Sequence, residues 1–250
     1  MKKRFCILII SVVLLISAYV FFWTNSIHIE ASVTTYPFAL EIWKDLLINN
    51  KQISMVATPD TFNDLVSGKA DIIFVTVPNN EQQELLKHSE WDFELIPVST
   101  ENVVILVNKN NPLIDISSED LNRIYTSNLK RSDFWWDLEP INSYQISINN
   151  GSATVFNKVI SWNIIDEHHI ETPYMDVLID LLWNDKYWIW YAFYTFSNEM
   201  YRNNKLKIIS IDGKSYNEDN YPLKSNIFLW YNKYNKKLSV VNFIKNFTYN

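Results

Sequence analysis

Glycine is scarce in this chain, which has only 3 glycines among its 250 residues. Loops of the Walker or dinucleotide-binding type need several glycines at fixed spacing to cradle phosphates, so these motifs are absent. The sequence also contains no Gly-x-Ser-x-Gly elbow and no His-Glu-x-x-His pair, and spacing alone pairs none of its carboxylates as acid and base. We therefore expect a protein that is not an enzyme.

Cysteine, histidine and basic residues are also few. Cys6 is the only cysteine, so the chain cannot form an internal disulfide. The formal net charge is -6 and no basic stripe stands out, which argues against nucleic acid as a partner. The segment Asp166-Glu167-His168-His169, with Glu171, offers metal-ligand residue types, but adjacent histidines on a strand point to opposite faces. We expect an exposed loop there, with no metal and no cofactor.

Hydrophobic residues, in contrast, make up 48% of the sequence, and charged residues make up 20%. That balance is typical of a globular protein rather than a disordered one. A chain of 250 residues is long enough for one large core or for two lobes.

The N-terminus has the pattern of a membrane anchor. Lys2, Lys3 and Arg4 precede an uncharged apolar run from Phe5 to Trp23, which as a helix would span roughly 28 Å, about one bilayer core. The basic residues should stay cytoplasmic, which places the rest of the chain outside the cytoplasm. A cleaved signal peptide is the alternative, but no A-x-A-like site ends this run. We expect residues 1–26 to be a cytoplasmic tip and an uncleaved anchor, with a secreted or periplasmic protein as the alternative.

The next segment alternates strands with helices. Apolar runs predict strands at Ile27–Ala31, Ile53–Val56 and Asp71–Val75, with helices at Phe38–Ile48 and Thr61–Val66 between them. This β-α-β-α-β order implies an α/β protein with a parallel sheet, in which ligands sit beyond the carboxyl ends of the strands. The residues there are Thr34, Thr35, Tyr36 and Thr76. Their hydroxyl groups either line one crevice or bond local backbone groups.

The rest of the chain continues the pattern. We expect a helix capped by Ser117 or Ser118, and a buried strand rather than a binding wall in the aromatic run around Trp188–Phe193. Further strands are expected at 95–98, 103–107, 145–148, 206–211 and 227–231, and further helices at 175–183 and 238–247.

The stretch Asn149-Asn150-Gly151-Ser152-Ala153-Thr154 predicts another helix start. Ser152 or Thr154 can cap a helix whose apolar side is Val155, Phe156, Val159 and Ile160. The start of a helix presents unpaired N–H groups and about half a positive charge, so it can seat an anion. The alternative is an ordinary capped helix without a ligand.

Five segments, in this order, resemble the phosphate-binding proteins of ABC importers, in the type II periplasmic-binding-protein superfamily. The similarity runs from about Ile27 to Phe247. The segments that carry it are Thr35-Tyr36-Pro37, Val66 to Ile72 followed by Thr76, Val104 to Lys130, Gly151-Ser152-Ala153-Thr154, and Ile211-Asp212-Gly213 with Tyr221-Pro222-Leu223.

The resemblance implies two α/β lobes joined by two crossing strands, with a ligand clamped between them. Lobe 1 would take residues 27–102 and 206–250, and lobe 2 would take 103–205. It also implies a solute receptor that presents phosphate or another small solute to an ABC permease or a sensor. The implied ligand-binding residues are Thr35, Tyr36, Thr76, Ser152, Ala153 through its N–H, and Thr154.

The sequence departs from the family pattern at its charged positions. Ile148 and Val77 stand where the family has arginines, and neither side chain can form the charge-assisted bonds of an arginine fork to phosphate. Ala153 and Trp190 replace family glycines. A site of hydroxyl and N–H groups suits a neutral or weakly anionic solute. The alternative is a degenerate binding fold that serves as a surface protein-interaction module, its cleft filled by side chains such as Trp190.

Overall fold

The structure is a computed structural model, and it describes residues 26–45, 53–126, 142–146, 150–159, 170–172, 183–201 and 205–248. The expected anchor at residues 5–23 therefore lies outside the described residues, as do residues 175–182 of the helix expected at 175–183 and the segment from Asp166 to His169. In the part of the chain that is described, no helix has both the length and the apolar character needed to cross a membrane.

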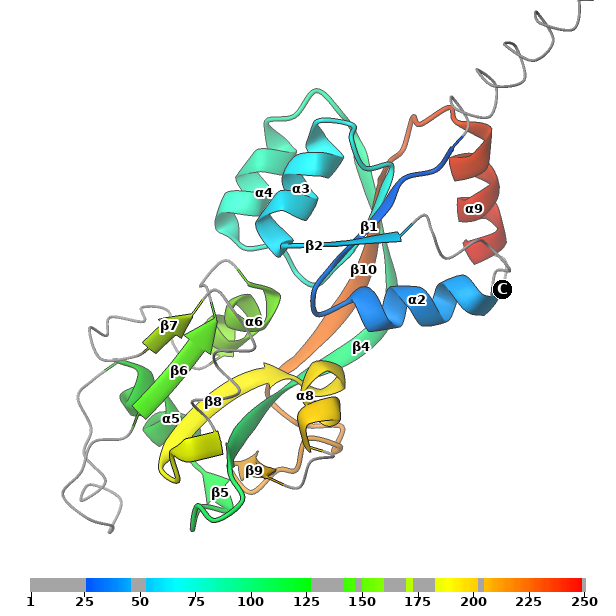
Figure 1. The fold of residues 1–250 in the computed structure, drawn as a ribbon. Helices are drawn as coiled ribbons and strands as arrows, with labels where there is room; N and C mark the ends of the chain where they lie inside the picture. Colours follow the sequence, from blue (N-terminus) through cyan, green and yellow to red (C-terminus); the bar gives the residue numbers. More distant parts are fainter. Residues whose placement is uncertain are drawn as a thin grey trace, which may run out of the picture.

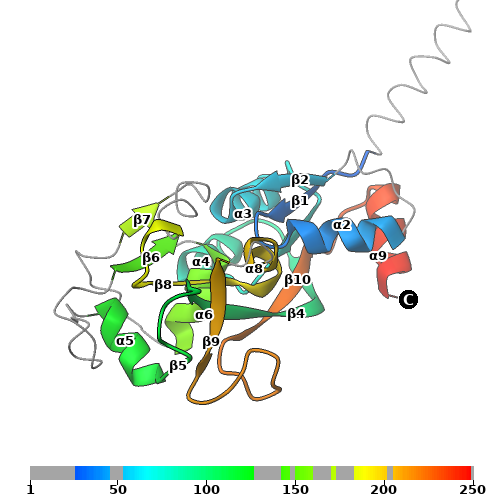
Figure 2. The ribbon, with the colours of Figure 1, turned by 60° about the horizontal axis from the view of Figure 1, so that its bottom comes forward.

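The first three strands of the chain form a parallel sheet, as the sequence predicts. We call this sheet, with β10 (Lys224–Asn232) and the helices that cover it, the first half of the molecule. Its strands β1 (Ile29–Ser32), β2 (Ile53–Val56) and β3 (Ile72–Val75) pair in parallel with β1 in the middle. Helices α3 (Thr58–Val66) and α4 (Asn80–Lys87) cover one face, and α2 (Tyr36–Asp45) and α9 (Leu238–Thr248) cover the other (Figures 1 and 2). Each face buries its own apolar cluster, so both faces of the sheet are covered.

In two helices of this half, local sequence signals explain where the helix begins or ends. Helix α3 begins three residues earlier than expected, because Pro59 suits a first helical turn, and it ends before Gly68, whose φ is 74°. Helix α4 was not expected from the sequence. Asn79 accepts a hydrogen bond from Gln82 N at 2.8 Å, and the Gln82 side chain accepts one from Asn79 N at 2.9 Å, which is a complete capping box.

One long strand connects the two halves of the molecule. Strand β4 (Phe93–Asn108) pairs through its first ten residues with β10 (Lys224–Asn232), which also pairs with β3. The register shifts between Ile227 and Phe228, opposite Pro97 and Ser99, where the missing N–H of proline interrupts the ladder. From Val103 onward β4 belongs to a second sheet (Figure 1).

The second sheet places β4 between β8 (Trp188–Phe193) and β9 (Leu206–Ile211), followed on the β8 side by β6 (Asn142–Ile146) and β7 (Ile170–Thr172). A short strand, β5 (Asp115–Ile116), pairs with β9. Helices α5 (Ser118–Thr126) and α6 (Gly151–Val159) pack on one face, and α8 (Tyr194–Tyr201) follows β8. The expected buried strand at Trp188–Phe193 is confirmed, since all six of its residues are buried.

The pairing of β9 corrects one part of the expected lobe division. Residues 206–250 were assigned to lobe 1, but β9 pairs with Ile105 to Asn108 of β4 in the second sheet. Ile209 and Ile211 are buried in the cluster that contains α5 and α6. The chain returns to the first sheet only at β10, so the second crossing comes after Leu223, whose carbonyl accepts the N–H of Val103 at 2.9 Å.

Candidate functional site

The three threonines predicted at the rim of the first sheet, Thr34, Thr35 and Thr76, are buried, and Tyr36 is partly buried. Ser32 at the end of β1 contacts both following threonines, with its Oγ 3.2 Å from Thr34 Oγ1 and 2.9 Å from Thr35 Oγ1. Thr35 Oγ1 in turn donates to the carbonyl of Phe74 on β3 at 2.6 Å. The hydroxyl proton of Thr35 is therefore used to tie two strand ends together, and its side chain acts here as a local structural group.

Tyr36 and Pro37 begin helix α2. The Tyr36 ring packs against the apolar cluster between the sheet and α9, so the side chain contributes to the core of the first half. Pro37 has no N–H, which leaves Tyr36 and Phe38 as the residues that supply N–H groups at this helix start. A contribution of Tyr36 to a ligand would come from its backbone, and it stays a prediction.

Thr76 differs from Thr35 because its hydroxyl has no hydrogen-bond partner among the residues that the structure describes. It follows β3 directly, its exposed fraction is 1%, and its Oγ1 makes no hydrogen bond in the part of the chain that is described. A buried hydroxyl without a partner costs free energy, which a hydrogen bond to a ligand would recover. This is the strongest sign of a polar binding position among the predicted residues.

The hydroxyl of Thr76 faces the start of α6 in the second half. A Cβ placed on Gly151 would overlap Thr76 Oγ1 and would also lie 3.5 Å from the Phe193 ring. Only glycine permits this approach, and it brings the end of β3 against the first residue of α6. The structure thus unites two segments that the sequence places 75 residues apart.

Helix α6 begins as expected, but a different residue caps it. Asn150 Oδ1 accepts hydrogen bonds from Ser152 N at 2.9 Å and from Ser152 Oγ at 3.0 Å, while the Asn150 carbonyl accepts Thr154 N at 3.0 Å and Thr154 Oγ1 at 3.2 Å. The prediction that Ser152 or Thr154 is the cap is therefore wrong. The N–H groups of Gly151 and Ala153 are at positions that helix geometry leaves without an intrahelical partner.

Packing fixes the position of α6. The Phe156 ring stacks on Tyr191 of β8 with the two centroids 4.0 Å apart, and Tyr125 of α5 meets Phe156 edge-on at 4.8 Å. Ser152 and Ala153 are buried, whereas Val159, expected on the apolar side, is 45% exposed. The start of the helix is thus held firmly against the sheet, in the way a preorganised binding position requires.

Trp190 does not fill the space beside α6. Residues alternate along β8, so Trp188, Trp190 and Ala192 face the cluster on the side of Tyr144 and Leu206, away from α6. Phe193 lies on the other face and contacts Gly151. The expectation that Trp190 fills a cleft beside α6 is therefore wrong. It was based on the position of Trp190 along the chain and did not consider which face of the strand the side chain lies on.

Other family-like segments have structural roles. Asp212 accepts a hydrogen bond from Ser118 N at 2.9 Å at the start of α5, and the Ser118 hydrogen bonds lower the pKa of the Asp212 carboxyl. Tyr221 donates from its hydroxyl to the Val103 carbonyl at 3.0 Å, where β4 crosses between the sheets. Burial raises the pKa of Tyr221, so this hydroxyl stays protonated and able to donate.

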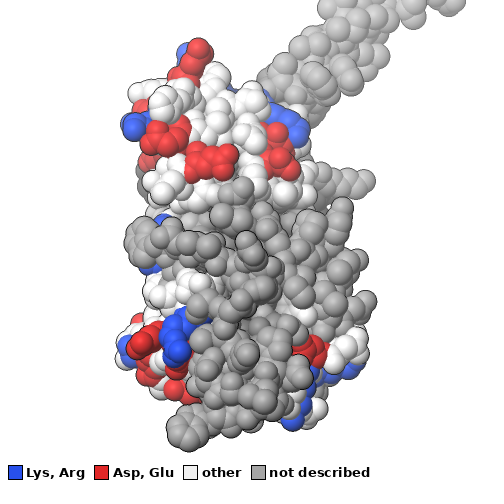
Figure 3. All heavy atoms as spheres, turned by 90° about the vertical axis from the view of Figure 1, so that its left-hand side faces the viewer, with Lys and Arg blue, Asp and Glu red and all other residues white. Residues whose placement is uncertain are grey.

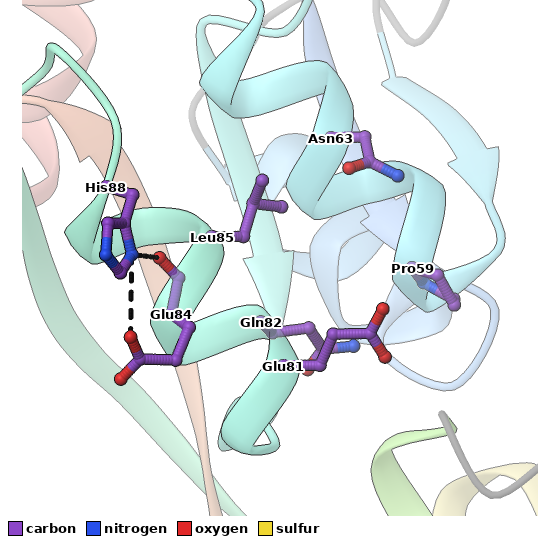
Figure 4. Close-up of a pocket in the computed structure, with 7 residues that line it drawn as sticks. All are labelled: Pro59, Asn63, Glu81, Gln82, Glu84, Leu85 and His88. Carbon is purple, nitrogen blue, oxygen red and sulfur yellow. Dashed lines mark hydrogen bonds and ion pairs between the residues drawn. The ribbon is translucent and has the colours of Figure 1, made fainter.

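A separate groove lies between α3 and α4, with a volume of about 390 Å³ (Figure 4). It is lined by Pro59, Asn63, Glu81, Gln82, Glu84, Leu85 and His88, and so contains none of the six predicted site residues. His88 Nδ1 lies 2.8 Å from the Glu84 carbonyl and 3.5 Å from Glu84 Oε2. Carboxylates are visible across this part of the upper lobe in Figure 3. Their negative charge makes the groove a poor seat for an anion.

Comparison with known proteins finds solved structures that share this fold. No protein-family model matches the sequence, and no curated protein matches it significantly. Among solved structures, the chain is similar to a putative phosphate ABC transporter substrate-binding protein with bound phosphate from Clostridium perfringens, with a TM-score of 0.73 and 14% identity over 90% of this chain and 93% of that one. An ABC-type phosphate transport receptor from Vibrio cholerae has a TM-score of 0.65 and 13% identity, over 89% of this chain and 93% of the receptor.

The chain has the fold of the phosphate-binding proteins of ABC importers. The same fold occurs in regulators: the regulatory domain of Synechocystis CcmR in complex with 2-PG has a TM-score of 0.62 and 11% identity, over 89% of this chain and 95% of that domain. The resemblance drawn from the five segments is confirmed as a likeness of fold, and the expected type II periplasmic-binding-protein architecture with it.

The structure therefore brings Thr35, Thr76 and the start of α6 into one region, while Ile148 lies outside the described residues. Sequence reasoning missed Asn150 and Phe193. Asparagine immediately before Gly151 is itself a strong capping signal, and the period of two along Trp188–Phe193 places Phe193 on the α6 side. Both signals are present in the sequence.

Proposed function

We propose that this protein is a membrane-tethered, extracytoplasmic solute-binding protein that holds phosphate or another small solute between its two halves and does not convert it. The observation that carries the proposal is the buried hydroxyl of Thr76, which faces the start of α6 and has no hydrogen-bond partner among the described residues. The fold shared with phosphate-binding proteins supports it.

The groups on offer suit a solute of low charge. Thr76 supplies a hydroxyl that donates and accepts, and the start of α6 supplies N–H groups and a partial positive charge. Val77 stands where a family arginine would add a full charge. A charged hydrogen bond is worth about 1.5–3 kcal/mol, so a phosphate dianion should bind here more weakly than a site with arginines binds it.

The remaining parts of the proposal rest on the sequence. Residues 1–26 would tether the protein to the cell membrane with the main domain outside, or would be removed to leave a secreted or periplasmic protein. An ABC permease or a membrane sensor would receive the solute. No nucleic acid, metal or cofactor is needed for this function.

Thermal unfolding of the full-length protein in nanodiscs tests the proposal. The protein is heated with phosphate, sulfate, molybdate and a set of small neutral polar solutes. A ligand at one hundred times its Kd should add about 2.7 kcal/mol of stability and raise the Tm. No shift from any oxyanion would remove the oxyanion version, and no shift from any solute would favour the second candidate.

The second candidate is a degenerate binding fold that acts as a protein-interaction module on the cell surface. The contact of Thr76 with Gly151, next to the Phe193 ring, favours it, because protein atoms already occupy that part of the interface between the halves. It predicts no solute-dependent shift in Tm and a specific protein partner recovered by crosslinking intact cells.

A further inference from the structure

Three loops meet at the end of the first half where β1 begins. His28, near the start of the described chain, donates from its N–H to Asp71 Oδ2 at 2.9 Å. Lys237 donates to the same carboxylate oxygen at 2.8 Å, and Asn235 donates to Asp71 Oδ1 at 3.0 Å. Lys233 N donates to the Asp92 carbonyl at 2.8 Å, which joins the loop before β4 to the same group.

These loops expose large apolar side chains. The exposed fractions are 49% for Trp91, 66% for Tyr234 and 57% for Leu238. They are three of the seven large hydrophobic residues exposed among the residues the structure describes, and two of them line one hollow of about 480 Å³ together with Gly68, Asp71, Lys236 and Lys237. An exposed cluster of this kind marks an interaction surface. We call Trp91, Tyr234 and Leu238 with the neighbouring Lys233 and Lys236 the aromatic end.

The aromatic end is held in a fixed shape. Tyr234 N donates to Asn232 Oδ1 at 2.9 Å and Lys237 N donates to Asn235 Oδ1 at 3.0 Å, so side chains order the turn from both sides. Ser89 Oγ donates to the Leu86 carbonyl at 2.9 Å in the loop that carries Trp91. Contact with a partner would therefore cost little ordering of the backbone that carries these side chains.

The short distance along the chain from the apolar run indicates which environment this surface faces. Trp23 ends the apolar run, and His28 is only five residues further on, a distance of at most about 17 Å for an extended chain. If the run spans a bilayer, His28 lies within that distance of the membrane surface, and the aromatic end adjoins His28 through the hydrogen bonds of Asp71. Tryptophan, tyrosine and lysine are the side chains that favour the headgroup region of a bilayer.

We propose that the aromatic end rests on the lipid headgroups and orients the first half on the membrane, which leaves the second half free to move. This rests on the tether in the proposed function. Four lysines at this end, Lys69, Lys233, Lys236 and Lys237, are offset by Asp64, Asp71, Glu90 and Asp92. Attraction therefore comes from the aromatic rings, and the contact depends little on anionic lipid.

Spin labels at single cysteines test the contact in the full-length protein. In a Cys6→Ala background, a nitroxide is attached at Tyr234→Cys or Leu238→Cys, with Ile114→Cys as the control. Ile114 is 77% exposed and precedes β5, at the opposite end of the molecule in Figure 1. In phosphatidylcholine bilayers, labels at 234 and 238 should collide with a water-soluble nickel chelate roughly threefold less often than the label at 114, as headgroup burial requires.

Three other outcomes would overturn the proposal, and each can be distinguished from the other two. Protein retained in the bilayer with position 234 as accessible as position 114 rejects the membrane contact alone. Protein that washes off at alkaline pH rejects the tether as well. Protection that disappears when the protein is diluted in lipid indicates a second copy as the occupant. Adding Trp91→Ser to the protein labelled at 238 should restore access of the chelate.

Discussion

At Gly151 the two halves of the protein approach each other closely. Its missing side chain leaves room for the Thr76 hydroxyl, and a Cβ there would overlap that oxygen. The glycine is the first residue of α6, where alanine would otherwise be preferred by up to about 1 kcal/mol. Helix propensity therefore favours alanine at position 151, whereas the contact with Thr76 requires glycine.

We predict that Gly151→Ala destabilises the protein by about 1–3 kcal/mol, the usual cost of overpacking. Thr76→Ala in the same chain removes the overlapping oxygen and should recover most of the loss. Urea unfolding of the wild type, the two single variants and the double variant gives the coupling between the two positions. A stabilising Gly151→Ala, or additive effects, would contradict the contact.

Glu30 gives a second prediction for a single residue. It lies in β1 with its carboxyl buried, and burial and then the neighbouring Asp64 raise its pKa to about 7. Asp60 raises the pKa further and Lys69 lowers it, while His28 Nε2 lies 3.2 Å from Glu30 Oε1. The folded state thus binds this proton more tightly than the unfolded chain does.

The stability of the protein should therefore fall as the pH rises from about 4.5 to about 7, because over this range the unfolded chain releases the proton of Glu30 while the folded state still holds it. Glu30→Gln removes that requirement and should be more stable than the wild type at pH 8 by about 1–3 kcal/mol, with little difference near pH 4.5. Urea unfolding across this pH range measures the effect. Glu84→Gln on the exposed face of α4 is the control, and parallel curves for wild type and Glu30→Gln would refute the prediction.

At the scale of the elements, the sequence predicts most of what local signals determine. The three parallel strands of the first sheet are marked by apolar runs, and α5 is capped by Ser117, one of the two expected residues, which exchanges hydrogen bonds with Asp120. Helix α6 and strand β8 also lie where the pattern places them. The signal is a continuous apolar run for the buried strands, and a capping group next to a period of 3.6 residues for the helices.

What the sequence could not predict depends on contacts between distant segments. The pairing of β9 with the second sheet is set by Ile105 to Asn108 of β4, about 100 residues away along the chain. The approach of Gly151 to Thr76 is likewise a tertiary contact that no local pattern encodes. Helix α4 was missed for another reason: its sequence is mostly polar, and Gln82 is its only fully buried residue.

The start of α8 is held by β4, the strand that crosses between the two sheets. Glu101 of β4 accepts hydrogen bonds from Thr195 Oγ1, from Thr195 N at 3.4 Å and from Asn102 N at 3.0 Å. A carboxylate at the start of a helix is favourable by charge and by hydrogen bonding. The contact links the crossing point to the helix that follows β8.

Glu101→Ala should cost about 1–3 kcal/mol, the value for leaving these donors without a charged acceptor. Thr195→Val should cost less, because the backbone N–H of residue 195 remains available. Double-mutant analysis by urea unfolding should show coupling between the two positions. If Glu101→Ala unfolds at the same urea concentration as the wild type, the carboxylate does not stabilise α8.

At the scale of the whole molecule, two sheets share one strand, and the halves meet where β3 ends and α6 begins. The halves are connected by β4 and by the chain that enters β10 after Leu223. Binding between halves joined in this way allows hinge closure around a solute. We expect the solute to bind at this junction, with Thr76 as one of its partners.

Calorimetric titration of the full-length protein tests that claim most directly, with the solute that gives the largest shift in Tm. Thr76→Val keeps the shape of the side chain and removes the hydroxyl, and Thr126→Val, at a half-buried helix end in the second half, is the matched control. Loss of one hydrogen bond in a closed site, at about 1–3 kcal/mol, predicts binding about five- to one-hundred-fold weaker for Thr76→Val and unchanged for Thr126→Val. Equal affinities for the wild type and Thr76→Val would contradict the account.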